Sequence, residues 1–380
     1  MTKLKLFEMF AGYGGASFAL KKANIPFECV GYSEIDKYAI QCYEQNHKNV
    51  KNYGDCKIIN PSDLPDFDLL TGGFPCQSFS LAGKRLGSKD KRGLLFFDII
   101  KIAKVKKPRY MLLENVKGLL SIKHKEIFDL MLEKLDEIGY TVFYHIFNTK
   151  DFGLPQNRER VFFICFLKSE DVNSFKIPNK KELNLFLKDV LDKDVEQKYF
   201  LKEDRIKKLM LHINDKHKND IIQLNKPNHS SQRVYDINGI APTLTAGNNG
   251  GGKEPCKIIQ LDASNIRREG KFRTYNDYSR CINTSQGGGH TPYIIHNCLT
   301  EAIGRSGSSS EFKNSCQKVY DSSLQIRKIT PIECFRLMGF VKDEINLNGL
   351  SDTQKYKLAG NGWDINLVSK IFEGMIQNGS

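Results

Sequence analysis

The chain is 380 residues long, and 40% of its residues are apolar, 27% charged and 11% aromatic. This length predicts two folded units, or three at most, and no stretch approaches the ~20 apolar residues of a membrane helix, so a membrane-spanning or mainly disordered protein is excluded. The 57 Lys and Arg residues against 44 Asp and Glu give a net charge of +13, which favours a polyanionic partner.

The first ten residues are apolar, but Lys5 and Glu8 interrupt them and no small-residue cleavage site follows. We therefore interpret them as a first strand of a cytoplasmic protein and not as a signal peptide.

Up to about residue 168, β-rich runs alternate with amphipathic helical stretches, which predicts an α/β domain with a mostly parallel sheet. The predicted strands are 5–10, 27–33, 67–71, 110–113, 141–147 and 161–167. The predicted helices are 17–23, 37–46, 94–105 and 124–138. Ligands of such open sheets bind at the carboxyl ends of the strands, so we look for chemistry there.

The turn from Phe10 to Gly15 closes the first strand and opens a helix, but it lacks the final glycine of a dinucleotide fingerprint. Glu34, at the end of the second strand, can accept hydrogen bonds from ribose hydroxyls. Asp55, which we place after the third strand, can meet an adenine edge. Together these residues predict an adenosine-bearing cofactor that need not carry phosphate.

Cys76 follows an apolar strand on a loop with Gly73 and Pro75. A cysteine at the catalytic edge of a sheet is a poor packing residue, and the basic stretch after it, with ten Lys or Arg and two Asp in residues 81–110, favours a thiolate. The ten cysteines form no C-x-x-C pair, so we expect neither a metal site nor a disulfide framework.

Two further segments carry polar side chains to the same region. Glu114 and Asn115 end a strand, so a carboxylate emerges at the same edge of the sheet. Arg158 and Arg160 lead into the next apolar strand, and because residues two apart project to one side, these two can act together.

From about 176 to 325 the sequence becomes lysine-rich and then rich in Gly, Ser, Asn and Thr, which predicts a second domain. A segment at 233–255 is echoed at 273–292, including a triple glycine in each; chance and two loops built on one plan are both open explanations. After this region, Thr330, Pro331 and Glu333 predict a helix start with a capping box.

Seven segments in order resemble the DNA (cytosine-5)-methyltransferase family. They are Phe10–Gly15, Glu34–Asp36, Gly73–Ser78, Glu114–Val116, Gln156–Arg160, Arg327–Gly339 and Gly360–Asn361. The resemblance implies a catalytic domain at 1–175 on the S-adenosylmethionine-dependent methyltransferase fold, a target-recognition domain at 176–325, and a segment at 326–380 whose last helix returns to the catalytic domain.

The resemblance also implies the chemistry. Cys76 would add to C6 of a flipped-out cytosine, Glu114 would contact N3 and the exocyclic amine, and Arg160, supported by Arg158, would hold the base oxygen. Asn115 would belong to the same catalytic set. The methyl donor S-adenosylmethionine would be bound by Phe10, Gly12, Gly14, Glu34, Asp55, Pro75 and Asn361. Many relatives have a small residue and then an aliphatic one after Gly-Asn, and this chain has Gly362 and Trp363 there.

The implied partner is double-stranded DNA, with the basic loop 83–93 closing over phosphates and Thr243-Leu244 resembling a pair common in recognition domains. Arginines that could contact a groove are Arg233, Arg267, Arg268, Arg273, Arg280 and Arg305. We expect a monomer of bacterial or phage type, with a cognate restriction endonuclease, if there is one, acting separately.

Three alternatives are open. A tRNA-methylating relative of the same fold is disfavoured because the recognition region lacks a Cys-Phe-Thr element. A catalytically inactive DNA-binding relative is disfavoured by the complete set of catalytic residues. A nicotinamide-dependent oxidoreductase is disfavoured by the incomplete glycine fingerprint.

Overall fold

The structure is a computed structural model that describes residues 3–74, 95–170, 172, 175–201, 216–218, 221–223, 234–235, 239–244, 257–261, 324–341 and 344–376. Several predicted features lie outside these residues: Pro75, Cys76, the loop 83–93, the second copy of the repeat at 273–292, and the arginines Arg233, Arg267, Arg268, Arg273, Arg280 and Arg305. Within the described part, no helix has the length and apolar character needed to cross a bilayer.

The chain divides into two compact units. The first unit comprises Met1–Leu185, Thr243–Gly247 and Cys334–Ser380, and the second comprises Phe186–Pro242 and Asn248–Glu333. Thr243 and Leu244, which the sequence places within the recognition region, therefore belong to the first unit.

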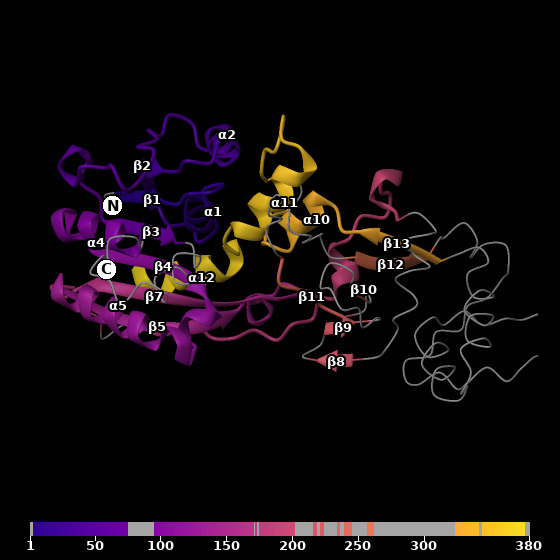
Figure 1. Ribbon diagram of the computed structural model, residues 1–380. Helices are drawn as coiled ribbons and strands as arrows, with labels where there is room; N and C mark the ends of the chain where they lie inside the picture. Colours follow the sequence, from indigo (N-terminus) through magenta and orange to yellow (C-terminus); the bar gives the residue numbers. More distant parts are fainter. Residues whose placement is uncertain are drawn as a thin grey trace, which may run out of the picture. The chain divides into compact units, whose positions relative to one another are not determined.

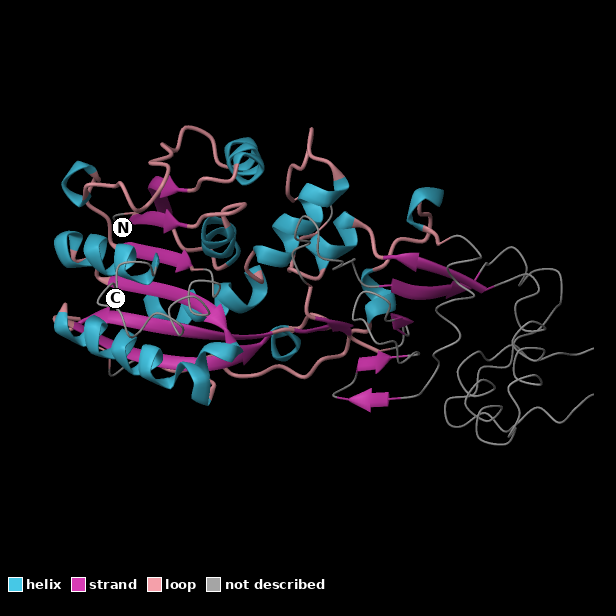
Figure 2. Cartoon of the chain, viewed as in Figure 1, coloured by secondary structure: helices cyan, strands magenta, loops and turns pink. Residues whose placement is uncertain are grey.

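The first unit contains a six-stranded sheet in the order β2-β1-β3-β4-β7-β5 (Figures 1 and 2). Its strands are β1 (Leu4–Met9), β2 (Phe27–Ser33), β3 (Leu69–Gly73), β4 (Tyr110–Val116), β5 (Tyr140–Asn148) and β7 (Glu159–Leu167). The pairs β1–β2, β1–β3 and β3–β4 are parallel, whereas β7 runs antiparallel to both β4 and β5. The predicted mixed, mostly parallel sheet is confirmed, and the strand ends differ from the predicted ones by at most three residues.

Four helices of the first unit agree with the predicted positions. They are α1 (Gly15–Lys22), α2 (Lys37–Asn46), α4 (Leu95–Lys106) and α5 (Lys125–Glu137). The unit also contains α11 (Asp352–Asn361), which the sequence did not predict, and α12 (Ile365–Ile376). The remaining short elements are the 3-10 turns η1 (Pro61–Asp63), η3 (Lys117–Leu120), η4 (Ile122–His124) and η5 (Thr149–Phe152) and the strand β6 (Gln156–Asn157). The α12 helix packs against α1, so the end of the chain returns to its beginning.

Alternation along the strands determines what each face of the sheet contacts. Phe7 and Met9 of β1 belong to a large apolar cluster with α4 and α5, which lie on one face of the sheet (Figure 1). Glu8 points to the other face, where Ser17 of α1 and Tyr43 of α2 donate hydrogen bonds to it. A carboxylate thus lies buried on the face that carries α1 and α2.

The second unit is built on a sheet in the order β13-β12-β10-β9-β8. Its described strands are β8 (Lys216–Lys218), β9 (Ile221–Gln223), β10 (Val234–Tyr235), β12 (Lys257–Leu261) and β13 (Leu324–Lys328), with β11 (Ala241–Pro242) and the 3-10 turns η6 (Leu187–Val190) and η7 (Gln197–Tyr199) outside that sheet. Neighbouring strands are antiparallel except for β10 and β12.

The predicted capping box at the start of α10 (Pro331–Arg336) is confirmed. The Thr330 amide donates to Glu333 Oε2 at 2.6 Å, and the Glu333 amide donates to Thr330 Oγ1 at 3.2 Å. The same carboxylate accepts two hydrogen bonds of 2.8 Å from the buried guanidinium of Arg327 on β13. Glu333 therefore ties the helix start to the strand that precedes it.

Candidate active site

A pocket opens where β1 and β3 end, between the glycine-rich turn and the segment that connects α11 to α12. It is a small cavity of about 40 Å³ and is partly open to solvent. Its wall is formed by Glu8 to Tyr13, Gly15, Ala16, Thr71 to Gly73 and Asn361 to Trp363. Of the residues predicted to bind the cofactor, Phe10, Gly12 and Asn361 line this pocket.

The backbone of the turn takes conformations that only small residues adopt easily. Gly12 and Gly14 have φ angles of 58° and 84°, and a side chain on Gly14 would place its Cβ 2.2 Å from His47 Nε2. Phe10 also has a positive φ, 53°, which is rare for a large residue and occurs mostly where function requires it. Gly14 shapes the turn and does not line the pocket.

Glu34 is held by backbone amides beside the turn. Its Oε2 accepts from the Gly12 amide at 3.0 Å, and its Oε1 accepts from the amides of Ile35 and Asp36 at 2.8 and 3.0 Å. A carboxylate offers about four acceptor positions, so these three bonds leave capacity for a ribose hydroxyl. Glu34 does not itself line the pocket.

The position expected for Asp55 requires a correction. The sequence predicts that Asp55 follows the third strand. In the structure Asp55 comes before β3, and it follows a single parallel β-bridge between Tyr32 and Asn52. The bridge is too short to form a strand, and Asp55 Oδ1 accepts a hydrogen bond from the Lys57 amide at 3.0 Å. Asp55 lies half-buried outside the pocket wall.

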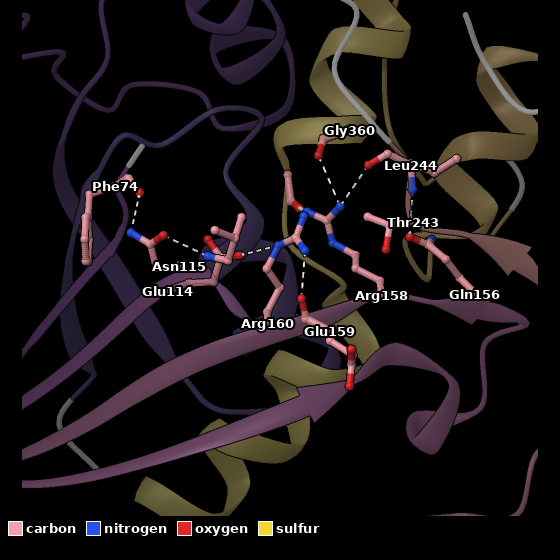
Figure 3. Close-up of polar contacts among 12 residues, drawn as sticks. Phe74, Glu114, Asn115, Gln156, Arg158, Glu159, Arg160, Thr243, Leu244 and Gly360 are labelled. Atoms are coloured by element: carbon pink, nitrogen blue, oxygen red, sulfur yellow. Dashed lines mark hydrogen bonds and ion pairs between the residues drawn. The ribbon is translucent and has the colours of Figure 1, made fainter. Parts of the chain in front are cut away.

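Glu114 and Arg160 form an ion pair at the edge of the sheet (Figure 3). Glu114 is on β4, and Arg160 lies opposite Val116 on the neighbouring β7, so both side chains project to one face. Arg160 Nε donates to Glu114 Oε1 at 2.8 Å, and both side chains are only slightly exposed, at 15% and 11%. The other carboxylate oxygen, Glu114 Oε2, lies beside Gly73, which lines the pocket.

Asn115 fixes the backbone that leads toward Cys76. Its Nδ2 donates to the Phe74 carbonyl at 3.0 Å, and its Oδ1 accepts from the Val116 amide at 2.8 Å (Figure 3). Phe74 is the last described residue before the cysteine loop. Asn115 therefore orients the strand end from which that loop departs.

Arg158 has different surroundings from Arg160. It is buried and donates to the carbonyls of Leu244, Gly360 and Gly362, at 3.2, 3.2 and 3.0 Å. Burial lowers the pKa of Arg158 to about 9, and the neighbouring Arg160 adds to this effect. The guanidinium is still charged at neutral pH, and it joins three segments of the first unit.

Gln156 belongs to the same structural network, which the sequence did not identify. Its Nε2 donates to the Leu337 carbonyl at 2.8 Å. Its Oε1 accepts from the Leu244 amide at 3.4 Å (Figure 3). Thr243 Oγ1 donates to the Asn157 carbonyl at 2.7 Å. The only sequence signal for this role was that Gln156 stands in the same motif as the two arginines.

The sheet order, the glycine-rich turn and the Glu34 carboxylate bonded to that turn are the features of an α/β enzyme of the methyltransferase class. The family model described as C-5 cytosine-specific DNA methylase matches residues 4–377. The chain therefore belongs to the C-5 cytosine-specific DNA methylase family, which uses S-adenosylmethionine and methylates cytosine C5 in DNA.

Relatives and solved structures agree with this assignment. The chain is 30% identical to the orphan methyltransferase M.SPRI of Bacillus phage SPR over 99% of this chain and 98% of that protein. It is 37% identical to the type II methyltransferase M.HhaI of Haemophilus parahaemolyticus over 65% of this chain and 75% of that one. The crystal structure of S. pombe Dnmt2 methyltransferase shares the fold, with a TM-score of 0.66 at 18% identity over 99% of both chains.

Proposed function

We propose that this chain transfers a methyl group from S-adenosylmethionine to C5 of a flipped-out cytosine within a specific double-stranded DNA sequence, through a covalent bond between Cys76 and C6. The observation that carries the proposal is the Glu114–Arg160 pair at the pocket rim, next to the strand end that leads to Cys76. A carboxylate and a fixed cation at this place are the groups that activation of a pyrimidine ring requires.

Cytosine C5 is a weak nucleophile, and Cys76 removes this obstacle. Its thiolate adds to C6, and the new Sγ–C6 bond leaves electron density at C5. Glu114 shares a proton with N3, which keeps negative charge off the ring, and Arg160 holds the base oxygen. After methylation the C5 proton leaves to a solvent base, and elimination breaks the Sγ–C6 bond and restores the thiolate.

The residues of the pocket suit the proposed methyl donor, which supplies an electrophilic methyl group when bound. Phe10, Gly12 and the exposed Asn361 line the pocket, and Glu34 retains acceptor capacity beside Gly12. The lack of a phosphate-binding glycine pattern agrees with a cofactor that carries no phosphate. Gly14, Asp55 and Pro75 complete the proposed set.

We further propose the domain roles that the sequence suggests. Residues 1–175 catalyse, 176–325 read the DNA sequence, and 326–380 link the two and return to the catalytic part. Flipping the base costs a few kcal/mol, which contacts from both parts recover. The enzyme acts as a monomer in a bacterial cytoplasm, with any partner endonuclease acting separately.

The test uses Cys76→Ser, with Cys29→Ser as the matched control. Cys29 is half-buried and its Sγ lies 3.2 Å from the Tyr43 hydroxyl, a contact that serine can keep. We expect Cys76→Ser to lose methylation of host DNA in bisulfite sequencing and to lose the denaturation-resistant adduct on DNA containing 5-fluorocytosine. Normal methylation by Cys76→Ser would overturn the proposed nucleophile.

A further inference from the structure

Trp363 is the single tryptophan of the chain, and it stands in the wall of the pocket. It lies between α11 and α12 and is 9% exposed. Neither the ion pair at the pocket rim nor the glycine-rich turn accounts for a large aromatic ring at this position.

The indole fits against two glycines. A Cβ on Gly15 would lie 3.1 Å from Trp363 Cβ, and a Cβ on Gly73 would lie 3.0 Å from Trp363 Nε1. The same Cβ on Gly73 would lie 3.1 Å from Glu114 Oε2. The ring therefore reaches from the turn that opens α1 to the strand end beside the proposed catalytic carboxylate.

Tyr13 fixes the backbone of Trp363. Its buried hydroxyl donates a hydrogen bond to the Trp363 carbonyl. Its ring occupies the space beside Gly362, where a Cβ would come within 1.9 Å of Tyr13 Cε1. Gly362, Tyr13 and Trp363 thus form one fitted set, and Phe162 of β7 packs edge-on against the indole at 5.9 Å between ring centroids.

The indole also brings a donor to the pocket wall. Trp363 lines the pocket, and its Nε1 lies beside Gly73. A rigid ring with an N–H in a pocket wall can both limit the space for a ligand and donate a hydrogen bond to it.

We propose that Trp363 is a positioning residue for the methyl donor, whose indole fixes the donor's reacting end beside Gly73 and Glu114. This inference rests on the proposed function. Because Trp363 is held through the Tyr13 hydroxyl, Tyr13, which also lines the pocket, contributes to the same task.

The first test combines calorimetry with intrinsic fluorescence, using S-adenosylmethionine as the probe. We expect its binding to change the emission of Trp363, which is the only tryptophan signal of the protein. In Trp363→Leu we expect the Kd for S-adenosylmethionine to rise ~10-fold and kcat at saturating cofactor to fall ~10-fold, since both ring and donor are lost. Trp363→Phe keeps a ring and should show a smaller effect on both quantities.

The second test leaves Trp363 and the Tyr13 ring in place and removes the hydroxyl that donates to the Trp363 carbonyl. Tyr13→Phe should raise the KM for S-adenosylmethionine ~5-fold, the effect of about one hydrogen bond. Tyr140→Phe is the matched control, because its buried hydroxyl donates to the Pro108 carbonyl at 2.7 Å and it does not line the pocket. We expect this control to lose similar stability with an unchanged KM.

The outcomes separate the two proposals. If the wild-type protein does not bind S-adenosylmethionine in calorimetry, the proposed function fails and this inference fails with it. If the wild type binds, but Trp363→Leu and Tyr13→Phe keep its Kd, KM and kcat within ~2-fold, only the role of Trp363 is overturned. A Trp363→Leu chain that does not fold leaves the decision to Tyr13→Phe.

Discussion

Arg158 and Arg160 stand two residues apart in the sequence, but they make different contacts in the structure. Arg158 donates to three backbone carbonyls, while Arg160 pairs with Glu114 near the pocket. The supporting role that the family resemblance suggests for Arg158 is therefore best understood as holding the segments around the site together. This interpretation can be tested by the same substitution at both positions.

Arg158→Lys should lower the free energy of unfolding by ~2–4 kcal/mol, because an ammonium cannot reach three carbonyls in a fixed fork. Arg160→Lys keeps a cation opposite Glu114, so it should cost less stability than Arg158→Lys, but it should reduce kcat ~100-fold because an oriented donor at the reacting base is lost. Urea unfolding and single-turnover methylation measure the two effects. Equal losses of stability in both variants would contradict the division of roles.

Glu8 is a second residue whose surroundings set its behaviour. Burial raises its pKa from the ordinary value of 4.5 to about 7, although hydrogen bonds from Ser17 and Tyr43 oppose the shift. Between these two pH values the folded protein keeps a proton that the unfolded chain has released. Stability from this group is therefore complete below pH 4.5 and is lost as the pH rises to 7.

Glu8→Gln has no proton to lose. We expect the wild type to lose up to ~3 kcal/mol of stability relative to this variant between pH 4.5 and 8, from the size of the pKa shift. Asp364, with a pKa raised by burial to about 7, and His47, with a pKa lowered by burial to about 4, titrate in both proteins and cancel in the comparison. Urea unfolding at several pH values measures the difference, and a constant difference would contradict the raised pKa.

At the scale of elements, the junction of β13 and α10 depends on one carboxylate. Glu333 pairs with Arg327 through two hydrogen bonds, and both side chains are completely buried. It also accepts from the amides of Thr330 and Asp192. The capping box was readable from the sequence, but the partner on the strand was not.

Glu333→Gln should lower the free energy of unfolding by ~3–5 kcal/mol, because the buried guanidinium of Arg327 then lacks a counter-charge. Glu344→Gln is the control, since Glu344 also accepts a hydrogen bond from a backbone amide, that of Val341 at 2.8 Å, without a buried cation. Thermal and urea unfolding check the comparison. Similar small losses in both variants would show that the cap alone matters.

At the scale of the whole molecule, the net charge of +13 has a measurable consequence. Binding to duplex DNA should weaken as salt increases, because basic side chains release the counterions of the phosphates. Replacing Lys84 or Arg85 with Ala should reduce the slope of log K against log salt by about one each, if these residues meet phosphates. Lys134→Ala on α5, where Lys134 pairs with Glu137, should leave the slope unchanged.

The sequence by itself determined the sheet, the glycine-rich turn, the capping box and the residues around the catalytic edge. These features depend on local rules, such as side-chain periodicity, glycine at positive φ and cap chemistry, which act within a few residues. The family is also readable from the chain alone, because seven short segments occur in it in a fixed order.

Only the tertiary structure decided which side chains meet. The separate tasks of Arg158 and Arg160, the position of Asp55 before β3, and the fit of Trp363 against Gly15, Gly73 and Tyr13 all depend on segments that are far apart in the chain. Periodicity shows which way a residue faces, but the groups that fill the space opposite it are set by the packing of the whole first unit.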